Sequence, residues 1–491
     1  MAYFKNSWWS AALLGWALWS PAWGAPANLP KSPTPSEPKP PALHTPAAEE
    51  KSPPASDLRA LSQEVLGQVY NILLDNALAP PKPTDIFYAY TQAMATYLKE
   101  QGLDGEWLAQ RPLVAKELER FEVPPLLNQL YQEATSRYPQ LQKDPHFTTH
   151  LAQAIMESAQ DPYTVFLSLE EYRDLDSSLT GDYSGSVGLT LAPHRDGEGR
   201  SHFVVASTAP QSPAREAGLE AGDELLAIDG RSLEKLDPQE CALLLRGTDG
   251  SKVQIRYQPA DPKAKARQVT LERTKVHYPS ASAQVLSLGK GQPSVGLLTV
   301  EMFTEYTNIE AERALRQLEK ANCRAYILDL RQNPGGYTNA ARDLCSKFLP
   351  QASLVAQLVG KGGKVEQSIY TYRNEHPQRP LIVLVDGRTA SAAELSAGAL
   401  RAVGKATLVG APTYGKNSSQ RIFNFEFPPG ETSACKVTYS HYKTPDGLDL
   451  GQEGLQPQVL VEMDPKLRRD PARDLQLQKA LQLLKEEFKR D

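Results

Sequence analysis

The sequence predicts an α/β domain in the carboxyl-terminal half of the chain, a smaller β-rich domain inserted before it, and an amino-terminal helical region. Two observations predict the α/β domain. Continuous apolar runs such as VGLLTV (295–300), AYILDL (325–330) and LIVLVD (381–386) are typical of buried parallel strands. Helical patterns over 308–321 and 391–403 alternate with these runs. This alternation favours strand–helix–strand units with right-handed crossovers.

Length, charge and cysteine content narrow the class of protein. The 491 residues suffice for two or three domains. The formal net charge of −5, from 53 basic and 58 acidic residues, gives no electrostatic reason to expect nucleic acid as a partner. The four cysteines form no CxxC pair and no His/Cys cluster with zinc spacing, so we expect no metal and no cofactor. We expect them to be buried apolar residues, with a Cys323–Cys345 disulfide as the alternative.

The first residues are typical of a secretory signal peptide, predicted over 1–24. A lysine precedes an apolar run over 8–20 that is too short to span a bilayer. Small residues then precede a cleavage site before Ala25, with a site after Ala27 and a retained anchor as alternatives. We therefore expect an extracytoplasmic protein, in the periplasm or an equivalent lumen, without stable membrane insertion after signal cleavage.

The next two regions carry no recognisable chemistry. Residues 25–56 are rich in proline, and we expect a disordered linker there. Over 57–182 apolar residues recur at helical spacing, and prolines at 80, 81 and 83 end the first helix. Further helical patterns cover 87–101, 112–121, 124–136 and 146–158. We expect a packing or capping region here, and a lid or partner-docking role is the alternative.

Strand patterns dominate from about 183. Four short runs punctuated by glycine predict strands, namely GLTLA, FVVAS, DELLAIDG and KVQIRYQP, and a helix is expected over 237–245. The chain ends in a predicted amphipathic helix over 473–488, within a terminal region 466–491. Its expected apolar face consists of Leu475, Leu477, Ala480, Leu481, Leu483 and Leu484.

Three segments contain candidate chemistry, and the first is TASAAE (389–394), which follows a buried strand and opens a helix. Ser391 would lie where unpaired amide groups and the helix dipole favour negative charge. The amide of Ala392 would be placed to donate to an oxyanion. The alternative role for Ser391 is an ordinary helix N-cap.

The second segment, TYGKNSSQ (413–420), contains Lys416. A lysine acts as a general base only when desolvation lowers its pKa toward the working pH. Gly415 would let the backbone approach closely, and Gln420 could orient the amine through its side-chain carbonyl. The alternative is a solvated surface lysine.

The third segment, DLRQNPGG (329–336), follows another buried strand. Gly335 and Gly336 expose backbone amides without a Cβ, so either could supply a second oxyanion donor. The alternative is an ordinary strand–helix turn.

Together these segments resemble the carboxyl-terminal processing proteases, also called tail-specific proteases. The serine and the lysine stand 25 positions apart, as in that family, and Gln420 matches the family's glutamine. DLRQNPGG, the later CKVTYSHYKTPDG (435–447) and DPYT (161–164) also resemble family motifs, so the resemblance covers about 161–485. Arg388, Thr389, Ala393 and Asn417 depart from the usual pattern.

This resemblance implies an α/β catalytic domain over 277–465 with a Ser-Lys dyad. Ser391 would be the nucleophile, Lys416 the general base and Gln420 its orienting group, with an oxyanion hole formed by Ala392 and by Gly335 or Gly336. Activity would rise with pH as the lysine loses its proton. A histidine triad built from His441 or His277 with Asp329 is a rival mechanism.

Residues 183–276 resemble a PDZ domain. SPA (212–214), AGL (217–219) and GDELLAIDG (222–230) match the module closely. In such a domain a substrate tail adds a strand to an exposed edge, and loop amides hold its carboxylate. The predicted loop is Ser186–Leu189. The candidate peptide-binding residues are Val187, Gly188, Leu189, Leu191, Leu243 and Leu244.

Arg246 closes the predicted helix of this domain beside Gly247. The resemblance implies that it couples the PDZ domain to the active site, and a helix C-cap is the alternative role. The expected partners are protein or peptide substrates with free C-terminal tails, and an adaptor or a homo-oligomer is a further candidate. The expected function is endopeptidase cleavage of proteins near their C-termini. A catalytically inactive PDZ scaffold and a substrate-delivery protein are the alternatives.

Overall fold

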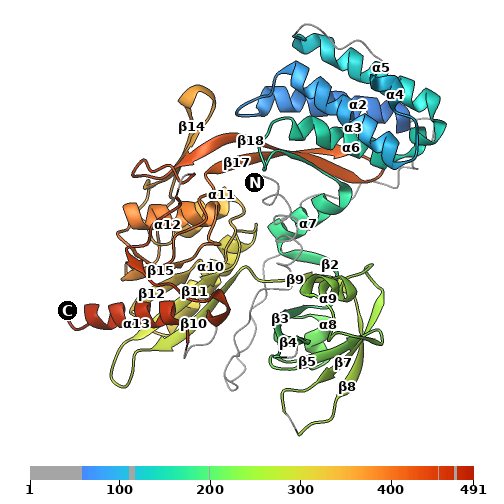
Figure 1. The fold of residues 1–491 in the computed structure, drawn as a ribbon. Coiled ribbons are helices and arrows are strands. Elements are labelled where there is room, and N and C mark those ends of the chain that lie inside the picture. Colours follow the sequence, from blue (N-terminus) through green and yellow to red (C-terminus); the bar gives the residue numbers. More distant parts are fainter. Residues whose placement is uncertain are drawn as a thin grey trace, which may run out of the picture. The chain divides into compact units, whose positions relative to one another are not determined.

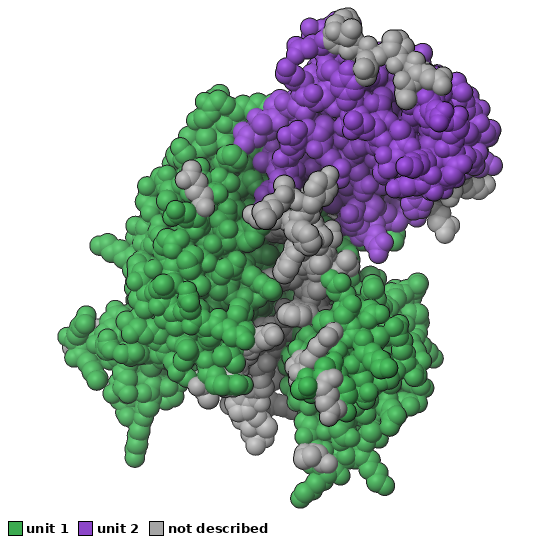
Figure 2. Space-filling view, viewed as in Figure 1, with its two compact units in different colours: residues 1–23, 173–420, 439–491 green, residues 24–172, 421–438 purple. Residues whose placement is uncertain are grey.

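Figure 1 shows a computed structural model of the chain. The structure describes residues 58–109, 117–197, 199–261, 263–451, 453–468 and 473–490. The predicted signal peptide, the predicted linker 25–56 and part of the helical pattern over 112–121 lie outside these ranges. The described residues form two compact units (Figure 2). Unit 1 contains residues 173–420 and 439–490, and unit 2 contains residues 58–172 and 421–438.

Unit 2 is the expected helical region with strands added to it. Its longer helices are α2 (Leu58–Asn76), α3 (Pro83–Glu100), α5 (Val123–Arg137) and α6 (Pro145–Glu157), and α4 (Glu106–Ala109) is a single turn. Pro83 stands in the first turn of α3, where its missing N–H costs nothing. Strand β1 (Val165–Leu167) pairs antiparallel with β18 (Thr432–Lys443). Buried side chains from the helices and from these strands form one apolar core.

Unit 1 contains the predicted α/β domain, and its main sheet has the strand order β10-β11-β12-β15-β16-β19. Its two edge strands are β10 (Ala281–Ser287) and β19 (Val459–Leu460). Strands β11 (Ser294–Val300) and β12 (Ala325–Asp329) are parallel, and α10 (Thr307–Lys320) connects them. Strands β15 (Leu381–Val385) and β16 (Thr407–Gly410) are parallel as well, and α12 (Ala392–Ala402) connects them. The predicted alternation of parallel strands and helices is therefore confirmed.

Helices cover both faces of this sheet. Its inner strands contribute to two apolar cores, because alternate strand residues point to opposite faces. Tyr326 and Leu328 of β12 pack in one core with α10, α11 (Thr338–Cys345) and α12. Ala325 and Ile327 pack in a second core with α13 (Leu475–Glu487), which lies along the sheet in Figure 1.

The expected apolar face of the last helix needs one correction. Leu477, Ala480 and Leu484 are buried, whereas Leu475 is half exposed, at 50%. Leu475 is the first residue of α13 and lies before Leu477, where the buried apolar face of the helix begins.

A second sheet of unit 1 contains β13 (Leu354–Val359), β14 (Val365–Tyr370) and the end of β18. Residues of β13 join the core beneath α12. The long strand β17 (Ser418–Glu426), which pairs with β18, carries the chain from the α/β domain into unit 2.

The inserted domain has the predicted strands and its own apolar core. Its sheet has the order β3-β4-β5-β7-β8, built from β3 (Leu189–Arg195), β4 (Ser201–Thr208), β5 (Glu224–Ile228), β7 (Lys252–Gln258) and β8 (Arg267–Glu272). Helix α9 (Pro238–Leu245) matches the helix expected over 237–245. Strands β2 (Asp182–Ser186) and β9 (Thr274–His277) pair with each other where the chain enters and leaves the domain.

All four cysteines are buried and have free thiols, so the expectation of buried apolar residues is confirmed. Among the described residues, no helix is long and apolar enough to cross a bilayer. The same part of the chain contains no cluster of histidine, cysteine and carboxylate side chains suited to a metal ion.

Candidate active site

Ser391 lies at the tight turn between β15 and α12, directly before the helix begins. It is nearly buried, and its backbone has a φ of 55° and a ψ of −120°. Such a conformation is strained for a residue with a Cβ, and strain of this kind is concentrated at functional sites. The turn is held by Asp386, whose Oδ1 accepts hydrogen bonds from the amides of Arg388 and Thr389. The surrounding turn therefore fixes a conformation that Ser391 alone would not favour.

Glu394 joins the first two predicted segments. Its Oε2 accepts hydrogen bonds from the amide of Ser391 at 2.8 Å and from the amide of Lys416 at 2.9 Å. Its Oε1 accepts from the amide of Gly415 at 2.8 Å and from Thr413 Oγ1 at 2.5 Å. The carboxylate is fully buried, at 0% exposure. Burial raises the pKa of Glu394, and the four hydrogen bonds oppose that rise without cancelling it.

Since both amide nitrogens lie within hydrogen-bonding distance of one oxygen atom, the backbones of Ser391 and Lys416 are held close together. No role was predicted for Glu394 from the sequence. Its position three residues after the serine, in the first turn of the helix, is the signal that could have identified it.

The third segment packs directly against the serine. The amide of Ala390 donates to the carbonyl of Asn333 at 2.9 Å. Gly335 has a φ of 107°, and a Cβ at this position would lie 2.8 Å from the Cβ of Ser391 and 3.0 Å from the amide nitrogen of Ala392. Only glycine fits so close an approach, as the sequence suggested.

The two glycines differ in what their amides do. The amide of Gly335 donates to Asn333 Oδ1 at 2.9 Å, so it is already engaged. In the part of the chain that the structure describes, the amides of Gly336 and Ala392 have no such acceptor. Of the three predicted oxyanion donors, Gly336 and Ala392 are therefore the better candidates.

Lys416 and Gln420 are both partly exposed. Lys416 lies two residues before β17, and Gln420 lies within that strand. The side-chain amide of Gln420 donates to Ser418 Oγ at 3.0 Å, which orients the carboxamide. Asn417, one of the departures from the family pattern, donates from its side chain to Asp449 Oδ1 at 2.6 Å.

Tyr442 is a site residue that was not predicted from the sequence. It lies on β18 and is almost fully buried, at 3% exposure. Its hydroxyl interacts with the side chains of Ser419 and Ser391, and burial raises the pKa of Tyr442 to about 12. The phenol is therefore neutral at physiological pH and can hold the serine hydroxyl in place. The signal was its location in the CKVTYSHYKTPDG motif.

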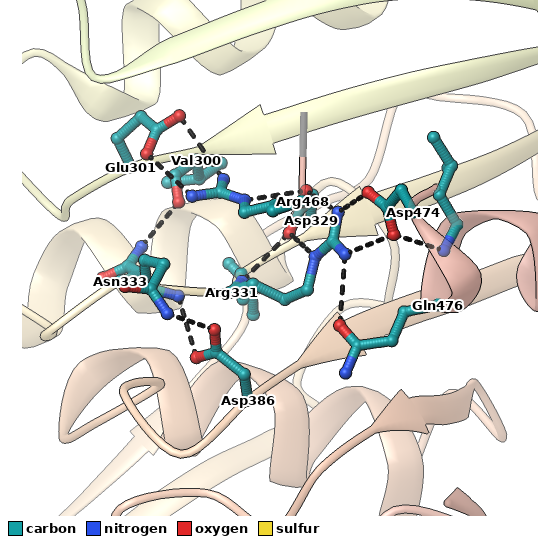
Figure 3. Close-up of polar contacts among 12 residues, drawn as sticks. Val300, Glu301, Asp329, Arg331, Asn333, Asp386, Arg468, Asp474 and Gln476 are labelled. Carbon is teal, nitrogen blue, oxygen red and sulfur yellow. Dashed lines mark hydrogen bonds and ion pairs between the residues drawn. The ribbon is translucent and has the colours of Figure 1, made fainter. Parts of the chain in front are cut away.

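A buried ionic cluster supports the turn that carries the two glycines (Figure 3). Arg331 binds Asp329 and Asp474, and Arg468 reaches Asp329 and Glu301. Burial by itself would raise the pKa of Asp329, but the two arginines outweigh it and hold the pKa below its usual range.

This cluster leaves no place for the rival histidine triad. Asp329 is bound by two arginines, and His277 contacts Asp182 and Glu310 instead. His441 is exposed on β18.

The candidate PDZ residues fall into two groups. Val187, Leu189 and Leu191 are buried in the core of the inserted domain, and Gly188 has a φ of 82°. Leu243 is 60% exposed. A small cavity beside the predicted loop is lined by Val187, Leu189 and Leu245, not by the predicted Leu243 and Leu244.

Leu245 lines the cavity in place of Leu243 because of helical geometry. It lies two positions after Leu243 and so faces another side of α9. Arg246 directly follows the helix, and its amide donates to the carbonyl of Ala242. Its guanidinium pairs with Asp174 at 3.3 Å and lies over the ring of Tyr183. Arg246 thus combines the C-cap position with a link to α7 (Leu169–Thr180).

Two family models and several known proteins are similar to this chain. Residues 294–461 match the model of peptidase family S41, and residues 204–259 match that of the PDZ domain. The carboxyl-terminal-processing protease of Synechocystis is 34% identical over 67% of this chain and 75% of its own length. That of Picosynechococcus is 35% identical over 66% of this chain and 76% of its own length. A solved photosystem II D1 C-terminal processing protease is 21% identical, with a TM-score of 0.45, over 82% of this chain and 93% of that one.

The extent and identity of these two protease matches, together with the two domain matches, place the chain in a known family. The chain belongs to the carboxyl-terminal-processing proteases and is a serine-type peptidase of family S41 with a PDZ domain.

Proposed function

We propose that the protein is an extracytoplasmic endopeptidase that cleaves proteins near their C-termini through a dyad of Ser391 and Lys416. The observation that carries the proposal is the shared acceptor Glu394 Oε2, which holds the backbones of both residues close together. The serine also precedes a helix whose amino-terminal amides favour a developing negative charge.

In the proposed reaction, Ser391 Oγ attacks the scissile carbonyl carbon, and neutral Lys416 accepts the hydroxyl proton. The amides of Ala392 and Gly336 donate to the resulting oxyanion. The lysine then protonates the leaving amine as the peptide bond breaks, which leaves an acyl-enzyme that water hydrolyses. Gln420 orients Lys416, and Tyr442 positions the serine hydroxyl.

The PDZ domain would recognise the substrate by its C-terminal tail. The tail would add a strand beside β3, and the amides of the loop Ser186–Leu189 would hold its carboxylate. Arg246, which pairs with Asp174 of α7, would couple this event to the active site.

Cleavage of an unstructured substrate tests the dyad. Casein should be fragmented by the wild-type protein, and Ser391→Ala and Lys416→Ala should each lower kcat by at least about 1000-fold. Lys320→Ala, which removes an exposed lysine at the end of α10, serves as the matched control and should cleave normally. If the two dyad variants cleaved casein as fast as Lys320→Ala, the mechanism would be wrong.

The same experiment separates the alternatives. An inactive scaffold or a substrate-delivery protein would bind casein or tail peptides without producing fragments in any variant. The extracytoplasmic location is tested separately, by expressing the full chain and determining the amino terminus of the mature protein. Proposed signal cleavage predicts a new terminus at Ala25, or at Asn28 for the alternative site.

A further inference from the structure

A tyrosine from another part of the chain lies in the proposed carboxylate-binding loop. Tyr278 directly follows β9, on the segment that leaves the PDZ domain. Its hydroxyl lies 3.0 Å from Ser186 Oγ and donates to the carbonyl of Leu189 at 3.4 Å. The amide of Gly188 donates to the same Ser186 Oγ at 3.2 Å, so it is linked to the phenol through that hydroxyl. The polar groups of the loop thus converge on a side chain of the protein itself.

The adjoining apolar end of the groove is filled as well. The rings of Tyr278 and Tyr183 pack edge to face, with centroids 5.4 Å apart. Together with Val187, Leu189 and Leu245, they line a cavity of only about 10 Å³, which is room for about one water molecule. The last side chain of a peptide could not enter this space while the two rings stay in place.

The Tyr278 hydroxyl occupies the loop as a carboxylate would, but it binds the polar groups there less strongly. Burial raises the pKa of Tyr278 to about 12, so the phenol is neutral at physiological pH. Hydrogen bonds from backbone amides to a charged carboxylate are about twice as strong as those to a neutral oxygen. A tail carboxylate would therefore compete successfully for the loop.

We propose that Tyr278 is an internal occupant of the PDZ peptide site and that a substrate tail displaces it on binding. The inference rests on the tail recognition proposed above. It adds to that recognition a residue, Tyr278, that sets the affinity for the tail. It also adds a conformational change, the displacement of Tyr278, that accompanies binding.

Displacement of Tyr278 would disturb a segment tied to the catalytic domain. Ser280, two residues on, donates from its amide to Glu310 Oε2 at 2.6 Å, and its hydroxyl bonds the same oxygen. That hydroxyl also lies 2.8 Å from Thr307 Oγ1, at the start of α10. The amide of Glu301 donates to the carbonyl of Ser280 at 2.9 Å.

From this point the contacts continue to the proposed oxyanion hole. Phe303, between Glu301 and α10, donates from its amide to the carbonyl of Gly335 at 2.8 Å. Its own carbonyl accepts from the amide of Tyr337 at 2.8 Å. A Cβ at Gly336 would lie 2.1 Å from that carbonyl oxygen, so this segment and the glycine turn are closely packed as well as hydrogen-bonded.

The test measures tail binding to the full chain in a Ser391→Ala background, which prevents cleavage. A fluorescent peptide with an apolar C-terminal residue and a free carboxylate is titrated with this parent protein and with the same protein carrying Tyr278→Phe. The C-terminally amidated form of the peptide is the ligand control. Loss of one competing hydroxyl should tighten binding of the free acid about 2–10-fold. The amidated peptide should gain less. Tyr257→Phe, which changes a tyrosine of β7 that does not line the cavity, should bind as the parent does.

Equal affinities of the parent and Tyr278→Phe for the free acid would overturn the proposal, as would the absence of binding to either protein. Hydrogen exchange gives a second readout, because bound peptide should raise exchange at the amides of Phe303 and Tyr337. Unchanged exchange there would refute the connection to the glycine turn. Failure of the proposed protease function would appear differently, as a lack of casein cleavage by the protein that retains Ser391.

Discussion

Arg331 and Asp474 lie 143 positions apart in the sequence, yet two hydrogen bonds of 2.8 Å join their side chains (Figure 3). Both residues are almost fully buried, at 2% and 0% exposure. Asp474 also caps α13 by accepting a hydrogen bond from the amide of Leu477. The final helix is thereby fixed to the same turn that presents Gly335 and Gly336 to the serine.

Replacement of Asp474 should destabilise the fold strongly. Asp474→Ala would leave the buried guanidinium of Arg331 with only Asp329 as its charged partner, and loss of one member of a buried pair costs about 3–5 kcal/mol. Urea unfolding of the full chain, followed by circular dichroism, measures the change. Glu117→Ala is the control, because its ion pair with Lys82 is exposed to solvent and should contribute little to stability. Equal effects of the two substitutions would contradict this account.

Glu394 should be required for catalysis without taking part in the chemistry. In Glu394→Gln, an NH₂ group replaces one of the two oxygens that accept from four donors, so two of these hydrogen bonds are lost. A displacement of about 1 Å at a catalytic group can cost about 100-fold, so kcat should fall to that extent with KM little changed. Steady-state kinetics on a peptide substrate measures it. Ser396→Ala, at another fully buried position of α12, is the control for packing. A Gln variant with normal kcat would refute the positioning role.

Tyr442 should contribute less, because a single hydroxyl is involved. Tyr442→Phe retains the buried ring and removes the group that interacts with Ser391 and Ser419. A hydrogen bond of this kind is worth about 0.5–1.5 kcal/mol, so kcat should fall about 2–10-fold while the melting temperature changes little. Tyr370→Phe, on the exposed strand β14, is the matched control. A loss of stability without a loss of kcat would assign Tyr442 to the core instead.

Much of the α/β domain could be predicted from the sequence because its parallel strands are buried on both faces. Runs such as VGLLTV and LIVLVD have no polar face to confuse their assignment, and they coincide with β11 and β15. Strand β14 was not predicted, because its residues VEQSIY are mostly exposed and lack a continuous apolar run.

The site was only partly predictable for a different reason. Motifs and their spacing identify Ser391, Lys416 and the two glycines, which lie in short local patterns. Local signals mark Glu394, in the first turn of its helix, and Tyr442, in its motif, but they do not name the distant partners on which the roles of these residues depend. Asp474 likewise acts through Arg331, 143 positions away in the chain. The same holds for Tyr278, whose partners Ser186 and Leu189 lie 92 and 89 positions away.

His277 lies between two carboxylates at the junction of the PDZ domain and the catalytic domain. Its Nδ1 is 2.7 Å from Asp182 Oδ1 and its Nε2 is 2.8 Å from Glu310 Oε1, and its ring packs edge to face with Tyr306. Lys275 shares Asp182 from the other side. The hydrogen bond to Glu310 has the largest effect and raises the pKa of His277, and the hydrogen bond to Asp182 raises it further. Burial alone would lower this pKa, but its effect is smaller than that of Glu310.

Stability should therefore fall as this histidine loses its proton. A pKa raised in the folded state means that the stabilisation is complete below the unfolded pKa of about 6.5 and is lost as the pH rises through the folded pKa. The melting temperature of the wild type, relative to that of His277→Gln, should accordingly decrease from about pH 6.5 upward. Thermal unfolding across a series of buffers from acid to mildly alkaline pH measures this difference. His441→Gln, at an exposed histidine, should follow the wild type throughout, and its retained protease activity would also exclude the rival triad. A constant difference between the wild type and His277→Gln would mean that the two carboxylates hold a neutral imidazole, and the junction would then be insensitive to pH.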